Sequence, residues 1–286
     1  MTLRDSAGRV TPVGGTHGQG ATLSVARFHG LGNVLMLLPV LRALQQSGRR
    51  VELVTHAAWA PALRALSTGL HVHTERREGT LDLDQATSSV RPSEHRTDEF
   101  ADLLGVPRRH WPILVRVPAA WAEPFHRSRG PVVFAPEAAH PSRRWPIAYA
   151  RQVAALLQGR PLWLTGLSQE PMIPCDEDLR GRLSLQELFG SIAAASAVIG
   201  MDSAVVQIAM MLGVPVVAIF GGVDPRFRIL PDARAVALVG RATCRPCNKN
   251  ETCGGAYDCI RRIQASDVME ALERLPAVRH REIWER

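Results

Sequence analysis

The 286-residue sequence has little of what several protein classes require. No apolar run is long enough to cross a membrane, and residues 1–22 lack the apolar segment of a signal peptide. Aromatic residues make up only 5%, which leaves few side chains to stack on single-stranded bases. There is no basic run and no repeat of fixed period. We therefore expect a cytoplasmic protein with residues 1–22 as a flexible tail.

The overall composition is that of a soluble globular chain. Hydrophobic residues make up 46% and charged residues 21%, enough for one large domain or two of ordinary size. The net charge is +7 and the pI about 9.9. Such a charge favours anionic partners such as nucleic acid, phosphorylated small molecules or acidic lipid heads. A general preference for arginine explains the same charge without any such partner.

The first part of the chain has the pattern of a βαβ unit. A strand over 23–28 is followed by a glycine turn and a helix over 33–48, and the next strand spans 49–56. Further elements are expected at 60–66, 70–75 and 97–105. Residues 118–130 have two prolines and little periodicity, which indicates a linker.

A second alternating series follows this linker. We expect strands at 131–136, 161–166, 197–200, 214–221 and 235–240, and helices at 146–159, 184–195 and 202–213. Ser184 and Glu187 have capping-box spacing, and Asp202 stands at an N-cap position. The pattern predicts an α/β fold with two Rossmann-like domains facing a cleft. We place them at 23–127 and 128–275, with a C-terminal helix at 276–286.

Four loops that follow expected strands have ligand-binding potential. Asp202, Ser203 and Ala204 open a helix, where free N–H groups and the helix dipole attract anions, although Asp and Ser are also ordinary caps. Arg143 and Arg144 precede another helix and suit a diphosphate, or form a solvated pair. The turn with Gly30 and Gly32 allows close approach of a ligand but lacks GxGxxG. Asp224-Pro225 is typical of a turn, with a binding role open.

The cysteines are concentrated in "TCRPCNKNETCGGAYDC", residues 243–259. Cys244, Cys247, Cys253 and Cys259 have the spacing C-x2-C-x5-C-x5-C, which favours a closed, structural metal centre with zinc or iron. Disulfides and free thiols are the alternatives. A loop with little apolar content would gain its folding energy from the metal.

The order of these pieces resembles glycosyltransferase family 9, the ADP-heptose:lipopolysaccharide heptosyltransferase family, over about residues 23–275. "GNVLMLLPVLRAL" is similar to the family's "GD-V-L-x-x-x-P-x-L-x-x-L", and "SRRWP" to its "K-x-W-P". The most specific match is "GMDSAVVQIAMMLGVPVVAIFGGVDP" to "V-D-[ST]-G-x-x-H-x-A-x-x-L-G-x-P-x-x-x-x-[FY]-G-x-T-D-P". The cysteine segment resembles the iron-binding finger of autotransporter heptosyltransferases.

This resemblance implies a GT-B fold and an inverting, metal-independent transfer of a heptose-like sugar from a nucleoside-diphosphate sugar. Arg143 and the backbone N–H groups of Ser203 and Ala204 would meet the phosphates, and Asp202 would hold sugar hydroxyls. Gln207 stands at the family's histidine position. The acceptor would be a saccharide, a protein side chain or a small natural product, with nucleic acid less favoured.

One departure concerns catalysis. Asn33 stands where the family has its proposed base, an aspartate, and an amide cannot take a proton. His29 is the first substitute base and Glu137 the second, although His29 also suits a polar turn. The alternative function is a non-catalytic module that binds nucleotide sugar or nucleic acid. A metal-sensing or redox protein is a third, disfavoured because four sulfurs leave no open coordination position.

Overall fold

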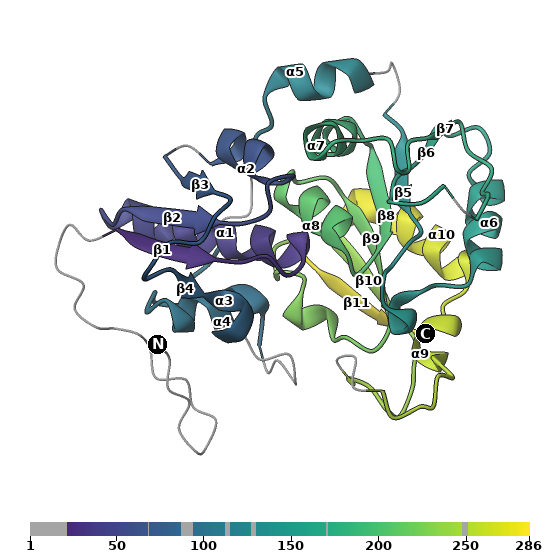
Figure 1. Cartoon of the computed structure of the whole chain (residues 1–286). Helices are drawn as coiled ribbons and strands as arrows, with labels where there is room; N and C mark the ends of the chain where they lie inside the picture. Colours follow the sequence, from purple (N-terminus) through teal and green to yellow (C-terminus); the bar gives the residue numbers. More distant parts are fainter. Residues whose placement is uncertain are drawn as a thin grey trace. The chain divides into compact units, whose positions relative to one another are not determined.

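This computed structural model describes residues 22–67, 69–86, 94–111, 115–126, 130–169, 171–247 and 251–286. The expected tail at 1–22 lies outside the described residues except for its last position. The chain forms two compact units, Met1–Ile113 and Leu114–Arg286 (Figure 1). The boundary therefore falls earlier than the expected 127/128.

Unit 1 is built on a parallel four-stranded sheet in the order β3-β2-β1-β4. The strands are β1 Leu23–Ala26, β2 Val51–Val54, β3 His71–His73 and β4 Leu81–Asp82, and the helices are α1 Leu31–Gln46, α2 Ala60–Leu66, α3 Leu83–Ala86 and α4 Arg96–Leu103. The predicted βαβ unit is confirmed, because β1 and β2 pair in parallel across α1. α1 ends at Gln46, and Gly48, just beyond its C-cap Ser47, has a φ of 85° in the left-handed region that favours glycine.

Unit 2 contains a seven-stranded sheet in the order β11-β10-β9-β8-β5-β6-β7, parallel throughout. Its strands are β5 Val132–Ala135, β6 Leu162–Leu164, β7 Glu177–Asp178, β8 Ala197–Met201, β9 Val216–Phe220, β10 Ala235–Val239 and β11 Glu282–Glu285. Its helices are α5 Ala119–Ala122, α6 Ile147–Leu156, α7 Leu185–Ala193, α8 Ala204–Met211, α9 Asp258–Arg261 and α10 Ala265–Arg274, with short 3-10 turns η1 Glu123–Phe125, η2 Pro141–Arg143, η3 Pro225–Phe227 and η4 Leu275–Ala277.

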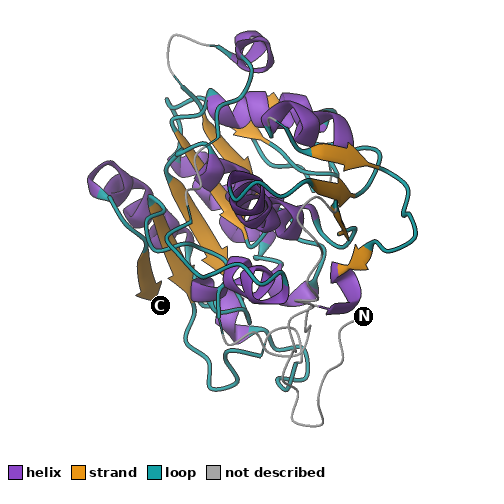
Figure 2. Ribbon diagram, turned by 90° about the vertical axis from the view of Figure 1, so that its left-hand side faces the viewer, coloured by secondary structure: helices purple, strands orange, loops and turns teal. Residues whose placement is uncertain are grey.

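Helices cover both faces of the unit 2 sheet. α7 and α8 lie on one face, and α6 and α10 lie on the other, as Figures 1 and 2 show. The central strands β8 and β9 are buried at every position, as expected for parallel strands covered on two sides. This arrangement is the doubly wound architecture that the alternating pattern predicts.

The C-terminal helix expected at 276–286 is wrong. The segment forms η4 and then strand β11, which pairs in parallel with β10. The backbone N–H of Arg286 donates to the oxygen of Val239 at 2.8 Å, and the N–H of Arg241 donates to the oxygen of Arg286 at 2.7 Å. β10 would otherwise present unpaired backbone groups at the sheet edge, and β11 satisfies them.

The prediction of a linker at 118–130 is also wrong. α5 and η1 occupy this segment and pack against α7 within unit 2. The approach is close: a Cβ at Gly190 would lie 1.8 Å from the carbonyl oxygen of Trp121. The Trp121 and Phe189 rings lie 6.3 Å apart. Apolar contact with α7 thus makes this segment part of the unit.

Candidate functional site

The strand order of unit 2 reverses between the neighbours β5 and β8. Ligands of open α/β sheets bind beyond the carboxyl ends of the strands at such a switch point. The loop that follows β5, residues 136–146, contains Arg143 and Arg144, and the turn that follows β8 contains Asp202 and Ser203. The topology therefore gathers the predicted donor residues at one sheet edge.

The start of α8 is free of side-chain caps. Ser203, not Asp202, is its N-cap residue, and its side chain makes no capping hydrogen bond. The Oγ of Ser203 is buried and has no hydrogen-bond partner among the described residues. The first N–H groups of a helix lack intrahelical partners, so the turn before Ala204 presents donors together with an unused hydroxyl. The prediction of Asp202 as the N-cap is wrong, and Ser203 holds that position without side-chain capping.

Asp202 lies between two guanidinium groups. Arg143 Nη1 donates to the Asp202 carbonyl oxygen at 2.5 Å and lies 3.6 Å from Oδ2. Arg228 Nε lies 3.9 Å from Oδ1. The Nε of Arg143 is buried and has no hydrogen-bond partner among the described residues. Two guanidinium groups and one carboxylate leave an excess positive charge, which suits an anionic ligand.

The other predicted donor residues have structural contacts. Arg144 is exposed and donates to the carbonyl oxygens of Ala138 and Ala139, which closes its loop. Gln207 donates through Nε2 to the carbonyl oxygen of Arg228 at 2.9 Å, and so holds the segment that carries that arginine.

Asp224 closes the turn after β9. Its carboxylate accepts from the backbone N–H of Arg226 at 2.9 Å and forms an ion pair with the Arg226 guanidinium. Burial acts to raise the pKa of the Asp224 carboxyl, but the hydrogen bonds from Arg226 outweigh burial and leave the pKa below its usual value. Asp224 is therefore engaged within its own turn.

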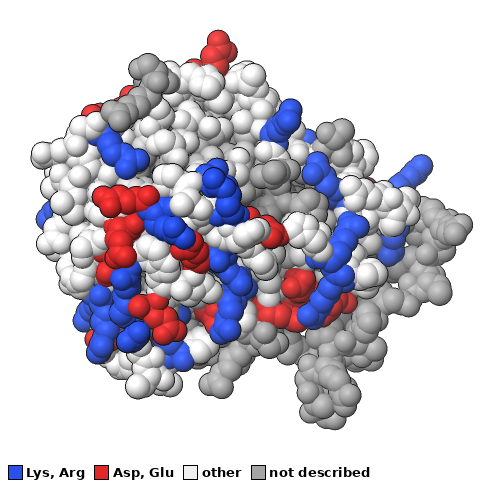
Figure 3. Space-filling view, turned by 180° about the vertical axis from the view of Figure 1, so that it is seen from behind, with Lys and Arg blue, Asp and Glu red and all other residues white. Residues whose placement is uncertain are grey.

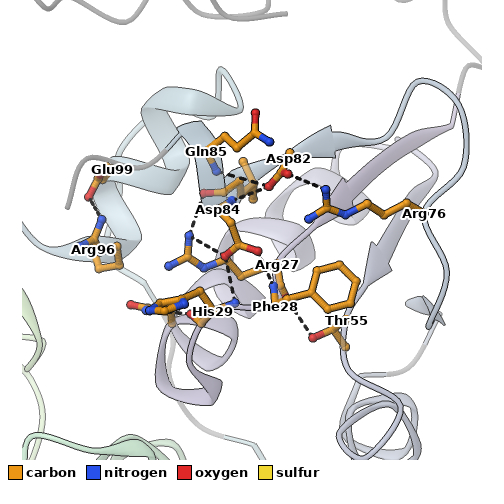
Figure 4. A network of polar contacts seen from close by, with 12 residues as sticks. Arg27, Phe28, His29, Thr55, Arg76, Asp82, Asp84, Gln85, Arg96 and Glu99 are labelled. Carbon is orange, nitrogen blue, oxygen red and sulfur yellow. Dashed lines mark hydrogen bonds and ion pairs between the residues drawn. The ribbon is translucent and has the colours of Figure 1, made fainter. Parts of the chain in front are cut away.

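In unit 1 a carboxylate occupies the turn after β1 (Figure 4). Asp84 accepts from the backbone N–H groups of Phe28 at 2.8 Å and His29 at 2.9 Å, and lies 3.3 Å from Nη1 of the buried Arg27. Turns of this kind bind phosphate through such N–H groups in nucleotide-binding domains. Here the chain's own carboxylate takes them, so this turn is not built as a second phosphate site.

Asn33, in the first turn of α1, contacts His29 in the turn that precedes the helix. The Nδ2 of Asn33 donates to the carbonyl oxygen of His29 at 3.1 Å, and the His29 side chain is exposed. Gly30 has a φ of 78°, and a Cβ there would lie 3.2 Å from Asn33 Nδ2. The Asn33 amide thus donates a hydrogen bond, which an ionised aspartate at this position could not do. The side chain of His29 faces solvent.

An aromatic cluster lies at the carboxyl edge of the same sheet. Phe28 meets His56 with ring centroids 5.2 Å apart, and His56 meets Trp59 at 4.5 Å, both edge to face. The Arg76 guanidinium lies 5.1 Å from the Phe28 centroid and 2.7 Å from the Asp82 carboxylate. Rings with hydrogen-bonding groups on either side suit a polar, ring-shaped ligand.

Glu137, the second candidate base, is used to hold a loop. Its carboxylate accepts from the backbone N–H groups of Leu167 at 3.0 Å and Ser168 at 3.1 Å. Arg180, fully buried, lies 3.7 Å from Glu137 and pairs with Asp178 at 2.7 Å. The Glu137 carboxylate is thus engaged in holding the loop at Leu167 and Ser168, which disfavours Glu137 as the base.

All five cysteines are free thiols in the structure. Burial raises the pKa of Cys259 to about 11; the other three thiols of the 243–259 segment add to the rise, and Arg245 opposes it. The backbone N–H groups of Tyr257 and Gly255 donate to the sulfur of Cys253 and lower its pKa. These N–H groups shift Cys253 toward its thiolate form, which is the form that binds a metal ion. Within the described parts of the chain, no three His, Cys, Asp or Glu side chains are arranged to hold a metal ion.

Sequence reasoning missed several residues of these sites. Arg228, in "DPRFRIL", reaches Asp202 only because the segment after β9 lies beside the turn after β8. Asp84, in "LDLDQA", binds the β1 turn because β4 pairs with β1. Neither residue stands in a recognisable motif. The only sequence signal for Arg228 is that two arginines, Arg226 and Arg228, closely follow Asp224-Pro225.

A family model for "Glycosyltransferase family 9 (heptosyltransferase)" matches residues 81–257. The match covers more than half of the chain and includes Asp202 and Ser203. The chain belongs to glycosyltransferase family 9. It is therefore a glycosyltransferase, as the sequence resemblance implied. No curated protein matches it.

Solved structures agree on the fold of this family 9 chain. A family 9 glycosyltransferase from Veillonella parvula DSM 2008 has a TM-score of 0.72 at 17% identity, covering 89% of this chain and 96% of that one. The iron-containing dodecameric heptosyltransferase TibC from enterotoxigenic E. coli, in complex with ADP-D-β-D-heptose, has a TM-score of 0.70 at 17% identity, covering 94% and 78%. E. coli heptosyltransferase WaaC with ADP has a TM-score of 0.58 at 15% identity, covering 91% and 99%. The predicted GT-B-like α/β fold is confirmed.

Proposed function

We propose that this family 9 enzyme transfers a heptose-like sugar, with inversion, from a nucleoside-diphosphate sugar to a hydroxyl acceptor. The donor diphosphate binds at the switch point of unit 2, to Arg143, Ser203 and the N–H groups at the start of α8. The observation that carries this proposal is a pair of buried hydrogen-bond donors, Ser203 Oγ and Arg143 Nε, that have no partner within the described part of the chain. Buried polar groups are normally satisfied, so two at one anion-binding edge indicate a ligand. TibC and WaaC bind ADP-heptose and ADP.

The chemistry needs no catalytic metal in this scheme. The guanidinium of Arg143 and the helix dipole stabilise charge on the departing diphosphate. Asp202, held between Arg143 and Arg228, accepts hydrogen bonds from sugar hydroxyls. A hydroxyl of the acceptor attacks the anomeric carbon from the opposite face, and His29 takes its proton. Ala204 keeps the approach to the α8 N–H groups open, and Asp224 and Gln207 support the surrounding turns.

We place the acceptor at the carboxyl edge of unit 1. The cluster of Phe28, His56, Trp59 and Arg76 offers ring faces and a guanidinium, which suit the ring and hydroxyl groups of a saccharide. A protein side chain or a small natural product remains an alternative acceptor. Because Asp84 already occupies the N–H groups of the β1 turn, unit 1 does not compete for the nucleotide.

The thiols of Cys244, Cys247, Cys253 and Cys259 suit a structural zinc or iron ion, and we propose that they hold one. The spacing C-x2-C-x5-C-x5-C and the two backbone N–H groups that donate to the Cys253 sulfur support this. A metal bound by four protein thiolates stabilises a small loop and leaves no position for chemistry. Elemental analysis of the purified protein and of a Cys253→Ser variant tests the assignment. About one zinc or iron per chain is expected, and metal-free wild-type protein would disprove it.

Calorimetric titration with ADP, UDP, GDP and dTDP tests the donor site. We expect one of the four to bind saturably, and Arg143→Ala and Ser203→Ala to weaken it by about tenfold or more each, because hydrogen bonds to charged groups contribute about 1.5–3 kcal/mol. Arg151→Ala, which removes an exposed arginine of α6, is the matched control. Failure of all four nucleotides to bind would refute the proposal.

The second candidate is a non-catalytic module that binds nucleotide sugar or nucleic acid, which Asn33 favours. On the face shown in Figure 3, arginine side chains are interspersed with Asp and Glu, and no stripe of one sign is visible there. No helix in the described part of the chain is long and apolar enough to cross a membrane. Nucleotide binding without any turnover would favour this module, and DNA binding that weakens steeply with salt would favour its nucleic-acid form. The cytoplasmic location stays a prediction.

A further inference from the structure

The cysteine loop contacts the donor loop within unit 2. We define the cysteine loop as residues 243–247 and 251–259, and the donor loop as residues 136–146, which carries Arg143. The contacts below give the cysteine loop a role in the transfer reaction. They rest on the proposed donor site and go beyond it.

The first contact joins Glu251 to His140. Glu251 Oε1 lies 3.5 Å from His140 Nδ1, and the two form an ion pair when the imidazole is protonated. The Glu251 side chain is 24% exposed, so water screens the pair only in part. The hydroxyl of Tyr257 donates to Glu251 Oε2 at 2.7 Å, which fixes the carboxylate from within the cysteine loop. His140 Nδ1 also lies 2.8 Å from Ser142 Oγ. A continuous set of contacts therefore leads from Tyr257 to the residue before Arg143.

The second contact passes through the turn after β9. Cys247 donates through its N–H to the carbonyl oxygen of Gly222 at 2.9 Å, and Arg245 Nε donates to that of Gly221 at 2.7 Å. A Cβ at Gly222 would lie 2.4 Å from Cys247 Sγ, and a Cβ at Gly221 would lie 1.9 Å from the Ser142 oxygen. The Gly221–Gly222 turn is thus packed so closely between the cysteine loop and the donor loop that neither glycine has room for a Cβ atom.

We propose that Glu251 is a positioning residue for donor binding: through His140 it sets the donor loop, and so places Arg143 against the diphosphate. The structural purpose of the cysteine loop is then to hold Glu251 and the Gly221–Gly222 turn. Because Glu251 acts on the loop that contacts phosphate, its effect should grow with the number of phosphates on the ligand.

The experiment compares wild type, Glu251→Ala, Glu251→Gln and, as control, Glu273→Ala, an exposed glutamate on α10. The ligands are the nucleoside diphosphate that wild type binds best and the corresponding nucleoside, both by calorimetry. We expect Glu251→Ala to weaken the diphosphate about fivefold, the upper range for a partly exposed ion pair. The nucleoside should change less than twofold. Glu251→Gln, which still accepts from Tyr257, should recover part of the loss, and Glu273→Ala should behave as wild type.

Amide hydrogen exchange over residues 136–146, measured without ligand, gives an independent readout. Faster exchange there in Glu251→Ala, with no change in α10, supports the proposal. Wild-type diphosphate affinity together with unchanged exchange in Glu251→Ala overturns it and leaves the donor site intact. If wild type binds no nucleotide, the proposed function fails, and the exchange at 136–146 still decides whether Glu251 positions the loop.

Discussion

Replacing Gly221 with alanine should displace the donor loop. Gly221 follows the last residue of β9, and the Cβ of an alanine there would lie 1.9 Å from the backbone oxygen of Ser142 and 3.6 Å from Cβ of Ile260. Real Cβ atoms essentially never approach a heavy atom within 3.0 Å. The obstacle is backbone rather than the end of a flexible side chain, so the loop itself has to move.

The size of the effect follows from that geometry. The separation has to grow from 1.9 Å to at least 3.0 Å, so the residue next to Arg143 moves by about 1 Å. Displacements of about 1 Å at a positioning group cost up to about a hundredfold in turnover. Overpacking by one methyl group also destabilises a packed site by about 1–3 kcal/mol. We expect the affinity for nucleoside diphosphate to fall by at least about tenfold and the transfer rate to fall further.

The assay combines calorimetry with thermal unfolding, so that affinity and stability are measured on the same preparation. Gly48→Ala is the control. Gly48 lies in unit 1 with a φ of 85° and open space around its Cβ, so alanine there costs about 1–2 kcal/mol of strain without touching the donor loop. It should lower Tm and leave nucleotide affinity unchanged. Wild-type affinity in Gly221→Ala would refute the packing of Ser142 against the β9 turn as a determinant of donor binding.

Three further predictions test other parts of the structure. His29→Ala should abolish turnover and leave nucleotide affinity intact in calorimetry; unchanged turnover removes His29 as the base. Ser184→Ala breaks the observed capping box of α7 and should lower the free energy of unfolding in urea by about 1 kcal/mol, whereas no loss would mean that the box is not stabilising. Arg180 bonds Asp178 and lowers its pKa, so the stabilisation is present above the unfolded pKa of about 3.9 and lost as pH falls through the folded one. Arg180→Met should cost about 3 kcal/mol at pH 7 and flatten the acid branch of stability against pH; an unaltered acid branch contradicts the assignment.

Much of the fold could be predicted because short stretches of sequence carry the pattern of the element that they form. The apolar run of β9 and the Ser184–Glu187 spacing are short-range signals, and both are confirmed. The strand β4 and the strand β7 were missed, since each has two residues and no period of its own. β11 was taken for a helix because its strand character depends on the edge of β10 that it covers.

The candidate site divides in the same way. Arg143, Ser203 and Asp202 could be named from the sequence, because each stands in a short motif that directly follows an expected strand. Arg228 and Asp84 could not, because each reaches its turn by a crossover of the sheet rather than by sequence distance. The contacts of Glu137 and Asn33 likewise depend on the folded chain and could not be predicted from their motifs.

By itself the sequence determined the class of enzyme, the parallel sheets and the edge at which the donor residues gather, since these follow from periodicity and from short motifs. Only the tertiary structure decided what each side chain faces. In the structure the Glu137 carboxylate accepts from the backbone N–H of Leu167, and the Asn33 amide donates to the carbonyl oxygen of His29. Ser203 Oγ has no hydrogen-bond partner among the residues that the structure describes. Hydrogen bonds form between atoms about 3 Å apart, and which atoms come that close depends on long-range packing that no local pattern encodes.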